Sequence, residues 1–295
     1  MVHGIAYNHY LCAMQTERSS FSVIGFLQLT RFWNLVIVAL AQYFTAVFLI
    51  DASLILDYRL FLLSLSTVLI AGAGYIINDY YDIKIDLINK PERVVIGRSI
   101  ARRYAIMFHS ILSFLGVVIG FYLEWQIGII NFLSAFLLWW YSNYLKRQPF
   151  IGNFTVAILT GMSIYLINVL YTYHPLVTIY SLFAFFMTII REIVKDMEDL
   201  KGDNTFGCRT LPIIWGIRQT KILVYVLLLC FCFIVIAMKL FYTQLPHYFF
   251  LVTLFAPLAF FMIRLIRADT KKDFYQLSQW CKFIMLLGIT SMIFI

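Results

Sequence analysis

The sequence predicts an all-α fold, a polytopic membrane helical bundle of about nine transmembrane helices. Of the 295 residues, 62% are hydrophobic and 13% are charged, and the mean hydropathy is +0.85. A soluble domain is roughly 45–50% apolar and about 25% charged, so it would have no way to bury this much apolar surface. The apolar residues also fall into stretches of about 20, the length that a helix needs to cross a bilayer.

Nine stretches have the length and composition of a membrane span. They lie near residues 26–50, 58–81, 104–123, 127–145, 151–171, 176–195, 219–240, 247–265 and 279–295. Little sequence is left over, so we expect a single domain over residues 1–295, in which residues 1–20 are a loose N-terminal segment. That segment has no basic region followed by an apolar run, so it does not look like a cleavable signal peptide.

The placement of charge predicts the topology. If the N-terminus is cytoplasmic and the spans alternate, all of the 23 basic residues except Arg59 and Lys239 lie on the cytoplasmic side. Positively charged loops favour this side of a membrane. Topology therefore explains most of the net charge of +8, and we expect no nucleic-acid partner.

Two segments on the expected cytoplasmic side are unusually polar. One follows the second stretch and the other follows the sixth. Their candidate oxygen ligands are Asn78, Asp79, Asp82 and Asp86 in the first segment and Asp196, Asp199 and Asp203 in the second. Carboxylates at the end of a membrane helix are costly unless hydrated or paired, so they indicate a functional site. Asn78 and Asp82 are four residues apart, as are Asp199 and Asp203, which places each pair on one helix face.

The seven side chains make an all-oxygen donor set without His or Cys. Such a set suits Mg²⁺, which binds few carboxylates and completes its shell with water and substrate phosphates. We expect Asn78, Asp82, Asp199 and Asp203 to act directly, with the other three as further ligands or support. Residues predicted to bind substrate are Arg31, Asn34, Lys84, Arg93, Lys146, Lys195 and Arg209. The alternative is that these charges only solvate helix ends, and that Arg31 is an interfacial anchor.

These segments resemble the two motifs of the UbiA superfamily of intramembrane prenyltransferases. Residues 78–86 match the pattern NDxxDxxxD, and residues 199–207 match DxxxDxxxG. Residues 89–93 match the basic segment N-[KR]-P-x-R, with Val94 where a proline is usual. Lys146 is similar to a family lysine that contacts diphosphate. Just before the first motif, residues 71–74 are small (Ala-Gly-Ala-Gly), and we interpret them as a close helix contact rather than room for a prenyl chain.

The resemblance implies a membrane bundle with a central cavity, two Mg²⁺ ions under a cytoplasmic cap and a lateral opening to membrane lipid. It implies transfer of a polyprenyl group from its diphosphate to a lipophilic acceptor. Residues 191–203 look most like digeranylgeranylglyceryl phosphate synthases, which implies geranylgeranyl transfer to a glycerol-phosphate ether lipid. An aromatic quinone precursor is the alternative acceptor. A small-molecule transporter is the non-enzyme alternative, although transporter sites usually lie at the bilayer midplane.

Overall fold

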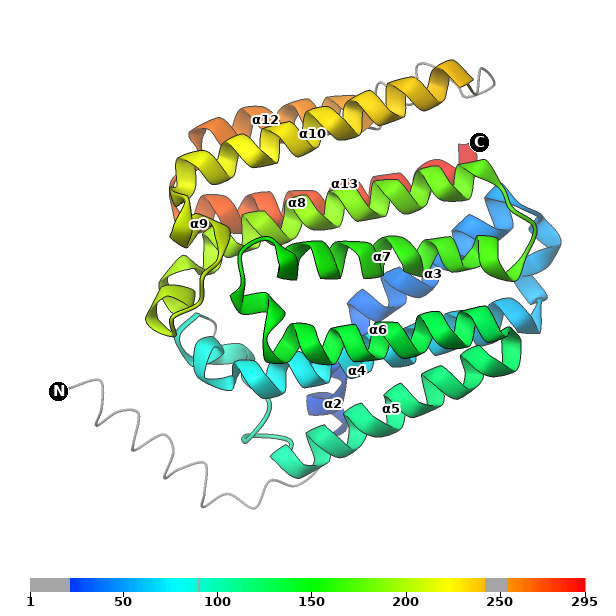
Figure 1. The fold of residues 1–295 in the computed structure, drawn as a ribbon, viewed down its shortest axis with the longest axis horizontal. Coiled ribbons are helices and arrows are strands. Elements are labelled where there is room, and N and C mark those ends of the chain that lie inside the picture. The colour runs from blue at the N-terminus through cyan, green and yellow to red at the C-terminus, as the bar shows by residue number, and fades with distance from the viewer. Residues whose placement is uncertain (1–21, 90, 242–253, 295) are drawn as a thin grey trace.

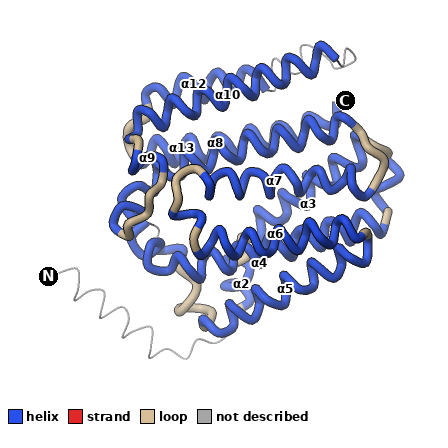
Figure 2. Tube along the Cα trace, viewed as in Figure 1, coloured by secondary structure: helices blue, strands red, loops and turns tan. Residues whose placement is uncertain are grey.

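Long helices make up almost all of the described chain. The computed structural model describes residues 22–89, 91–241 and 254–294, and in these ranges nine helices of 12 to 32 residues correspond to the nine expected spans (Figures 1 and 2). They are α3 (Phe32–Leu49), α4 (Tyr58–Asn89), α5 (Arg102–Leu123), α6 (Trp125–Asn143), α7 (Ile151–Leu170), α8 (Pro175–Thr205), α10 (Gly216–Phe241), α12 (Ala256–Arg267) and α13 (Lys271–Ser291). The shorter elements are α2 (Val23–Leu29), η1 (Ala52–Leu56), η2 (Pro91–Arg93), η3 (Leu145–Arg147), α9 (Leu211–Ile214) and η5 (Met292–Phe294).

The helices have the dimensions of a multi-pass membrane protein. Among the described residues, seven helices are long and apolar enough to cross a membrane, namely α3, α4, α5, α7, α8, α10 and α13. The predicted all-α membrane bundle is therefore confirmed. The expected N-terminal segment 1–20 and the first part of the eighth stretch lie outside the described residues.

Two helix boundaries differ from the hydrophobic pattern. The first stretch is broken at Arg31, which has φ 52 in the left-handed region and separates α2 from α3. The last helix starts at Lys271 rather than near residue 279. Thr270 and Asp273 form a capping box there, in which each side chain accepts a hydrogen bond from the other residue's backbone N–H. Polar residues thus form the start of this helix, which hydropathy alone does not detect.

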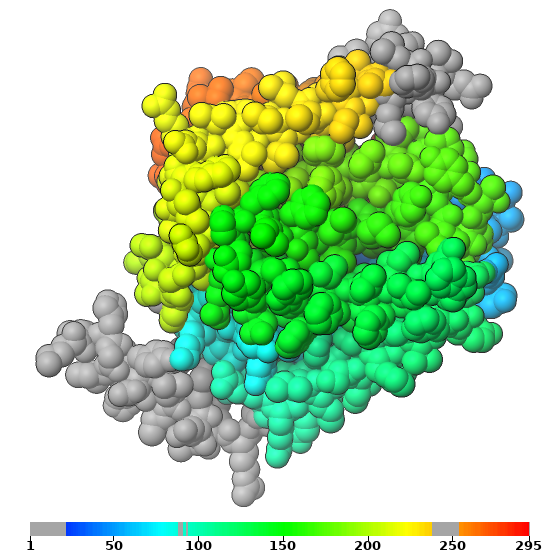
Figure 3. All heavy atoms as spheres, in the orientation of Figure 1, coloured from blue at the N-terminus to red at the C-terminus, as the bar shows by residue number. Residues whose placement is uncertain are grey.

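The helices α4 and α8 form the centre of the bundle. In each, 61% of the apolar window is buried, against 17–44% in the other five membrane-length helices. Helix α4 packs against α3, α5 and α6, helix α8 packs against α7, α10 and α13, and the two central helices touch each other. Figure 3 shows one face of the bundle, covered by α5, α6, α7, α8 and α10. Both central helices continue beyond the expected spans, to Asn89 and Thr205, so each carries its acidic motif on a continuous helix, as the spacing predicts.

Buried amides join the helices within the apolar interior. The Gln42 side chain on α3 donates hydrogen bonds to Thr67 Oγ1 on α4 (3.0 Å) and to the Ser163 carbonyl on α7 (2.7 Å). Asn131 on α6 donates to the Gly116 carbonyl on α5 (3.0 Å). In a membrane, helices associate through such hydrogen bonds and close packing because lipid is as apolar as their side chains. These bonds fix the helices that surround the central space.

Candidate functional site

The two acidic motifs lie near each other at one end of the bundle. The ends of α4 and α8 lie at the same end as α9 in Figure 1, and the two helices touch. Cys208, just after α8, lies within electrostatic range of both motifs. Burial raises the pKa of its thiol to about 11, and the carboxylates of Asp203 on α8 and Asp82 on α4 add to the rise.

A tight turn at the end of α8 shapes this region. Gly207 has φ 69, a left-handed conformation that glycine adopts at little cost and that commonly ends a helix. The backbone N–H of Cys208 then donates to the Asp203 carbonyl (2.9 Å), and that of Arg209 donates to the Arg147 carbonyl (2.8 Å). The turn therefore ties the second motif to η3.

The η3 element carries Lys146 into the first motif. Its Nζ lies 2.6 Å from Asp82 Oδ1 and donates to Asn78 Oδ1 at 3.3 Å. Burial lowers the pKa of Lys146, and the charge and hydrogen bond of Asp82 oppose this effect. Helix α7 begins close by, because a Cβ at Gly152 would lie only 2.8 Å from the Lys146 Cα. A glycine is needed there for the backbones to approach.

Arg31 reaches the same motif from the start of α3. Its Nη2 lies 2.9 Å from Asp79 Oδ1, and its guanidinium lies 4.8 Å from the centre of the Tyr75 ring. Burial by itself lowers the pKa of Arg31, but Asp79 and Tyr75 outweigh burial and raise it. The left-handed backbone at Arg31 is unusual for a residue other than glycine, and such conformations are found at functional sites.

A second polar network runs along α8. Asn153 on α7 donates to Asp196 Oδ2 at 2.9 Å. Glu192 accepts from Arg191 Nη1 at 2.5 Å, and its other oxygen lies 4.0 Å from Lys195 Nζ. These contacts hold the charged side chains of α8 on the side that faces α4 and α7.

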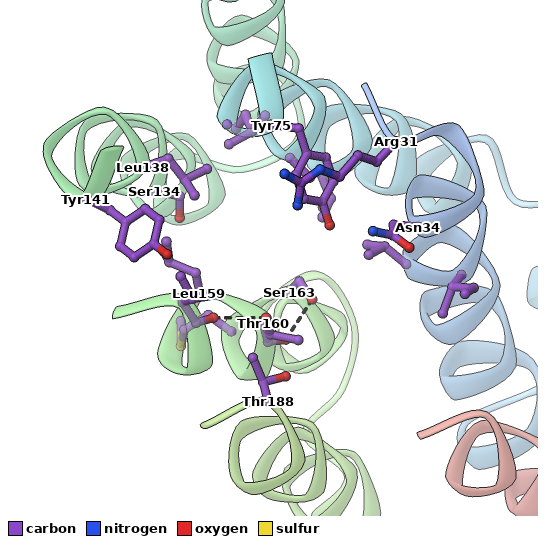
Figure 4. Close-up of a pocket in the computed structure, with 18 of the residues that line it drawn as sticks. Arg31, Asn34, Tyr75, Ser134, Leu138, Tyr141, Leu159, Thr160, Ser163 and Thr188 are labelled. Atoms are coloured by element: carbon purple, nitrogen blue, oxygen red, sulfur yellow. Dashed lines mark hydrogen bonds between the residues drawn. The ribbon is translucent and has the colours of Figure 1, made fainter. Parts of the chain in front are cut away.

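A cavity of about 280 Å³ extends from this polar end into the apolar interior. At the polar end it is lined by Arg31, Asn34, Asn78, Arg191, Glu192, Lys195 and Lys282. Further along, aliphatic residues of α3, α4, α6 and α7 dominate, and the aromatic rings of Tyr75 and Tyr141 lie on its wall. Figure 4 shows Arg31 and Tyr75 on one side of the cavity and Thr160, Ser163 and Thr188 on the other.

The small residues 71–74 before the first motif both pack against a neighbouring helix and line the cavity. Gly74 packs against α6, since a Cβ there would lie 2.8 Å from Leu138 Cδ1, and Ala73 is buried. Ala71 and Gly74 also line the cavity. Small side chains at this point therefore allow close helix contact and widen the cavity.

The predicted site residues fall into four groups. Arg31, Asn34, Asn78 and Lys195 line the cavity. Asp79, Asp82 and Lys146 contact residues of its polar end or each other, and Asp196 accepts a hydrogen bond from Asn153. Asp199 lies within electrostatic range of Lys195, and Asp203 lies within electrostatic range of Asp196. Asp86 lies within electrostatic range of Asp82 and Asp79. Lys84 and the side chain of Arg209 are exposed and do not line the cavity, and the side chain of Arg93 lies outside the described part of the chain.

Several lining residues were not predicted. Lys282 was not assigned a role, although a lysine inside an apolar stretch is a recognisable signal of function. Arg191 and Glu192 belong to the polar segment but were not chosen as ligands. Nothing in the sequence marks Tyr141 and Thr188 as site residues, because an isolated tyrosine or threonine is common in a membrane helix.

The donor set fits Mg²⁺ in its chemistry. Within the ranges that the structure describes, no three His, Cys, Asp or Glu side chains come together closely enough to hold a metal ion. Mg²⁺ does not require three, because it is usually held by one or two carboxylates plus water and substrate phosphates. Carboxylates on α4 and α8, two helices that touch, suit this requirement.

Comparison with known proteins agrees with the motifs. Residues 35–287 match the UbiA prenyltransferase family. The digeranylgeranylglyceryl phosphate synthase of Methanosphaera stadtmanae is 32% identical over 237 residues, 80% of this chain and 87% of that protein. The synthase of the same name from Methanothermobacter thermautotrophicus is 38% identical over 167 residues, 57% of this chain and 59% of that protein.

Solved structures share the fold. One, from a study of digeranylgeranylglyceryl phosphate synthase in membranes, has a TM-score of 0.72 and 25% identity, covering 92% of this chain and 97% of that chain. A UbiA homologue from Archaeoglobus fulgidus bound to GPP and Mg²⁺ has a TM-score of 0.63 and 15% identity, covering 92% of this chain and 100% of that chain. The chain therefore belongs to the UbiA prenyltransferase family, as its two acidic motifs predict, and is a multi-pass membrane enzyme.

Proposed function

We propose that this prenyltransferase moves a geranylgeranyl group from its diphosphate to geranylgeranylglyceryl phosphate, at the cytoplasmic side of the membrane. One observation carries the proposal: a mainly apolar cavity is lined at its polar end by Asn78 of the first motif, and the helices α4 and α8 that carry the two motifs touch. The choice of acceptor is supported by relatives named digeranylgeranylglyceryl phosphate synthase, which are 30–38% identical.

The polar end would hold the donor's diphosphate. Residues that would bind Mg²⁺ there are Asn78, Asp82, Asp199 and Asp203, with Asp79, Asp86 and Asp196 as further ligands or support. When bound, Mg²⁺ supplies positive charge that stabilises the departing diphosphate. Lys146 adds a buried cation at Asn78 and Asp82, in a position to donate to a diphosphate oxygen. Arg31, fixed by Asp79 and Tyr75, would orient the same group from α3.

The apolar part of the cavity would hold the isoprenoid chain and exclude water from the reacting carbon. In the transfer, the bond between prenyl C1 and the diphosphate oxygen breaks, and its electron pair stays with the diphosphate. A hydroxyl oxygen of the acceptor bonds to C1, and its proton passes to an oxygen of the departing diphosphate or of a carboxylate in the acidic motifs. Tyr75 and Tyr141 line the cavity, and the faces of aromatic rings attract the positive charge that develops on the allylic carbon.

The test is turnover by the purified protein. Incubation with geranylgeranyl diphosphate, Mg²⁺ and geranylgeranylglyceryl phosphate should give the digeranylgeranyl product, identified by mass spectrometry. Matched reactions would offer 4-hydroxybenzoate, homogentisate or 1,4-dihydroxy-2-naphthoate instead. Prenylation of one of these aromatics without prenylation of the lipid would show that the acceptor proposal is wrong.

The proposed cytoplasmic location is supported by the distribution of charge. Arg59, one of two basic residues expected outside, pairs with Glu124 at 2.8 Å, in the loops at the end opposite the acidic motifs. A cysteine introduced at the exposed Glu92 should react with a membrane-impermeant maleimide only after cells are permeabilised. A cysteine at the exposed Ser53, in the opposite loops, should react in intact cells. The reverse pattern would contradict the topology, and the unsubstituted chain gives the background.

A further inference from the structure

Three polar side chains line the cavity on the side away from the first motif. Thr188 and Arg191 lie on α8, and Lys282 lies on α13. Thr188 and Arg191 are three residues apart, so they share one face of the helix. Because α13 packs along α8, Lys282 reaches the same wall from the neighbouring helix. None of the three belongs to the acidic ligand set.

Two donors on this wall are buried without a partner among the described residues. They are the hydroxyl of Thr188 and Nε of Arg191. A threonine inside a helix commonly donates to the carbonyl four residues earlier, as Thr45 and Thr155 do, but Thr188 does not. It is only 4% exposed, and in Figure 4 it lies across the cavity from Arg31 and Tyr75. Burying an unsatisfied donor costs stability, so both atoms suit a bound acceptor atom.

Basic side chains outnumber acidic ones among the residues that line this wall. Arg191, Lys195 and Lys282 all line the cavity, and Glu192 is the one acidic residue among the lining side chains. On the other wall, Arg31 lines the cavity and pairs with Asp79. The α8–α13 wall therefore supplies three of the four basic side chains that line the cavity, and Arg191 pairs with Glu192 through Nη1.

We propose that Thr188, Arg191 and Lys282 form a subsite for the phosphate of the acceptor lipid, separate from the site of the donor's diphosphate. The inference rests on the proposed function, in which the acceptor is geranylgeranylglyceryl phosphate. A phosphate monoester presents several acceptor oxygens and more than one negative charge. It therefore suits a hydroxyl, a guanidinium fork and an ammonium group together. A neutral or singly charged aromatic acceptor would leave part of this set unsatisfied.

The test separates the two substrates kinetically. Thr188→Val removes the hydroxyl with little change of shape, and Lys282→Met removes the ammonium group. Lys272→Met is the matched control, because Lys272 is an exposed lysine on the same helix. For each protein, kcat and the KM of donor and acceptor are measured with geranylgeranylglyceryl phosphate and with geranylgeranylglycerol, which lacks the phosphate.

We expect the KM for the phosphorylated acceptor to rise about tenfold or more in both variants, the effect of losing a hydrogen bond to a charged group. The KM for the donor should not change. The wild-type preference for the phosphorylated acceptor should shrink by the same factor, and Thr188→Ser should retain it. A rise in donor KM alone, or no change in either KM, overturns the subsite while the proposed function stands. A wild-type protein that prenylates only aromatic acceptors overturns both.

Discussion

Replacing Lys146 by methionine tests the connection between η3 and the first acidic motif. The ammonium group lies 2.6 Å from Asp82 Oδ1, and the two side chains are only 9% and 15% exposed. Methionine keeps most of the length and the apolar stem of lysine but removes its charge. Asp82 would then remain buried without its nearest cation.

The magnitude follows from the burial of the pair. Removing one partner of a buried ion pair costs about 3–5 kcal/mol, because the remaining charge is uncompensated. Since Asp82 keeps some access to water, we expect the lower end of that range, about 3 kcal/mol. A loss of 1 kcal/mol lowers Tm by roughly 2 °C in a chain of this size, so the fall should be on the order of 6 °C. Loss of a cation that stabilises the departing diphosphate should lower kcat by about 10²–10³-fold.

The assay combines thermal unfolding in detergent with prenyl transfer. Arg147→Met is the matched control, because it removes a charge from the adjacent, exposed position. Added Mg²⁺ should restore part of the lost Tm in Lys146→Met and have less effect in the control, since a cation at Asp82 replaces the missing charge. If Lys146→Met keeps the Tm and kcat of the control, the pairing with Asp82 matters neither for stability nor for transfer.

Four further predictions follow from the same geometry. Asp199→Asn should abolish transfer while expression and membrane insertion stay normal, and a wild-type rate would reduce Asp199 to a helix-end charge. Excess EDTA should stop turnover in a radiolabelled transfer assay, whereas full turnover would exclude a Mg²⁺ requirement. Because burial lowers the pKa of Lys146, kcat/KM for the donor should fall with rising pH before a free lysine would lose its proton. Lys146→Arg should move that fall to higher pH, and an unchanged profile would assign it to another group. Gly152→Ala should destabilise the protein by about 1–3 kcal/mol, because its Cβ meets backbone atoms of Lys146 and Leu145. Gly74→Ala meets only the flexible end of Leu138 and should lower Tm less, so equal shifts would contradict this reasoning.

Local sequence determined the fold class and the position of both acidic motifs. Apolar stretches of membrane length specify helices without reference to the rest of the chain, because backbone groups in lipid must be satisfied within the helix. The four-residue spacing of Asn78 and Asp82 predicts one helix face, and α4 does continue to Asn89. The same periodicity argues against Lys84, which lies two residues after Asp82 and so points about 200° around the helix. It is exposed.

The hydropathy pattern did not predict two helix boundaries. The first stretch reads as continuous, yet the left-handed backbone of Arg31 divides it. The last helix begins within polar residues because of the capping box at Thr270. In both places a local backbone or side-chain interaction overrides the apolar pattern.

Only the tertiary structure decided which side chains meet. The pairs Arg31–Asp79 and Lys146–Asp82 join residues far apart in the chain, and Lys282 comes to the same cavity from the last helix. The spacing of these residues in the sequence does not predict that they meet, because a membrane helix can turn any face towards any neighbour until packing selects one. Here that selection is made by close contacts such as those at Gly74 and Gly152 and by the buried hydrogen bonds of Gln42. The sequence alone thus determined which polar side chains the helices carry, and the packing of α4 against α8 decided which of them lie close together.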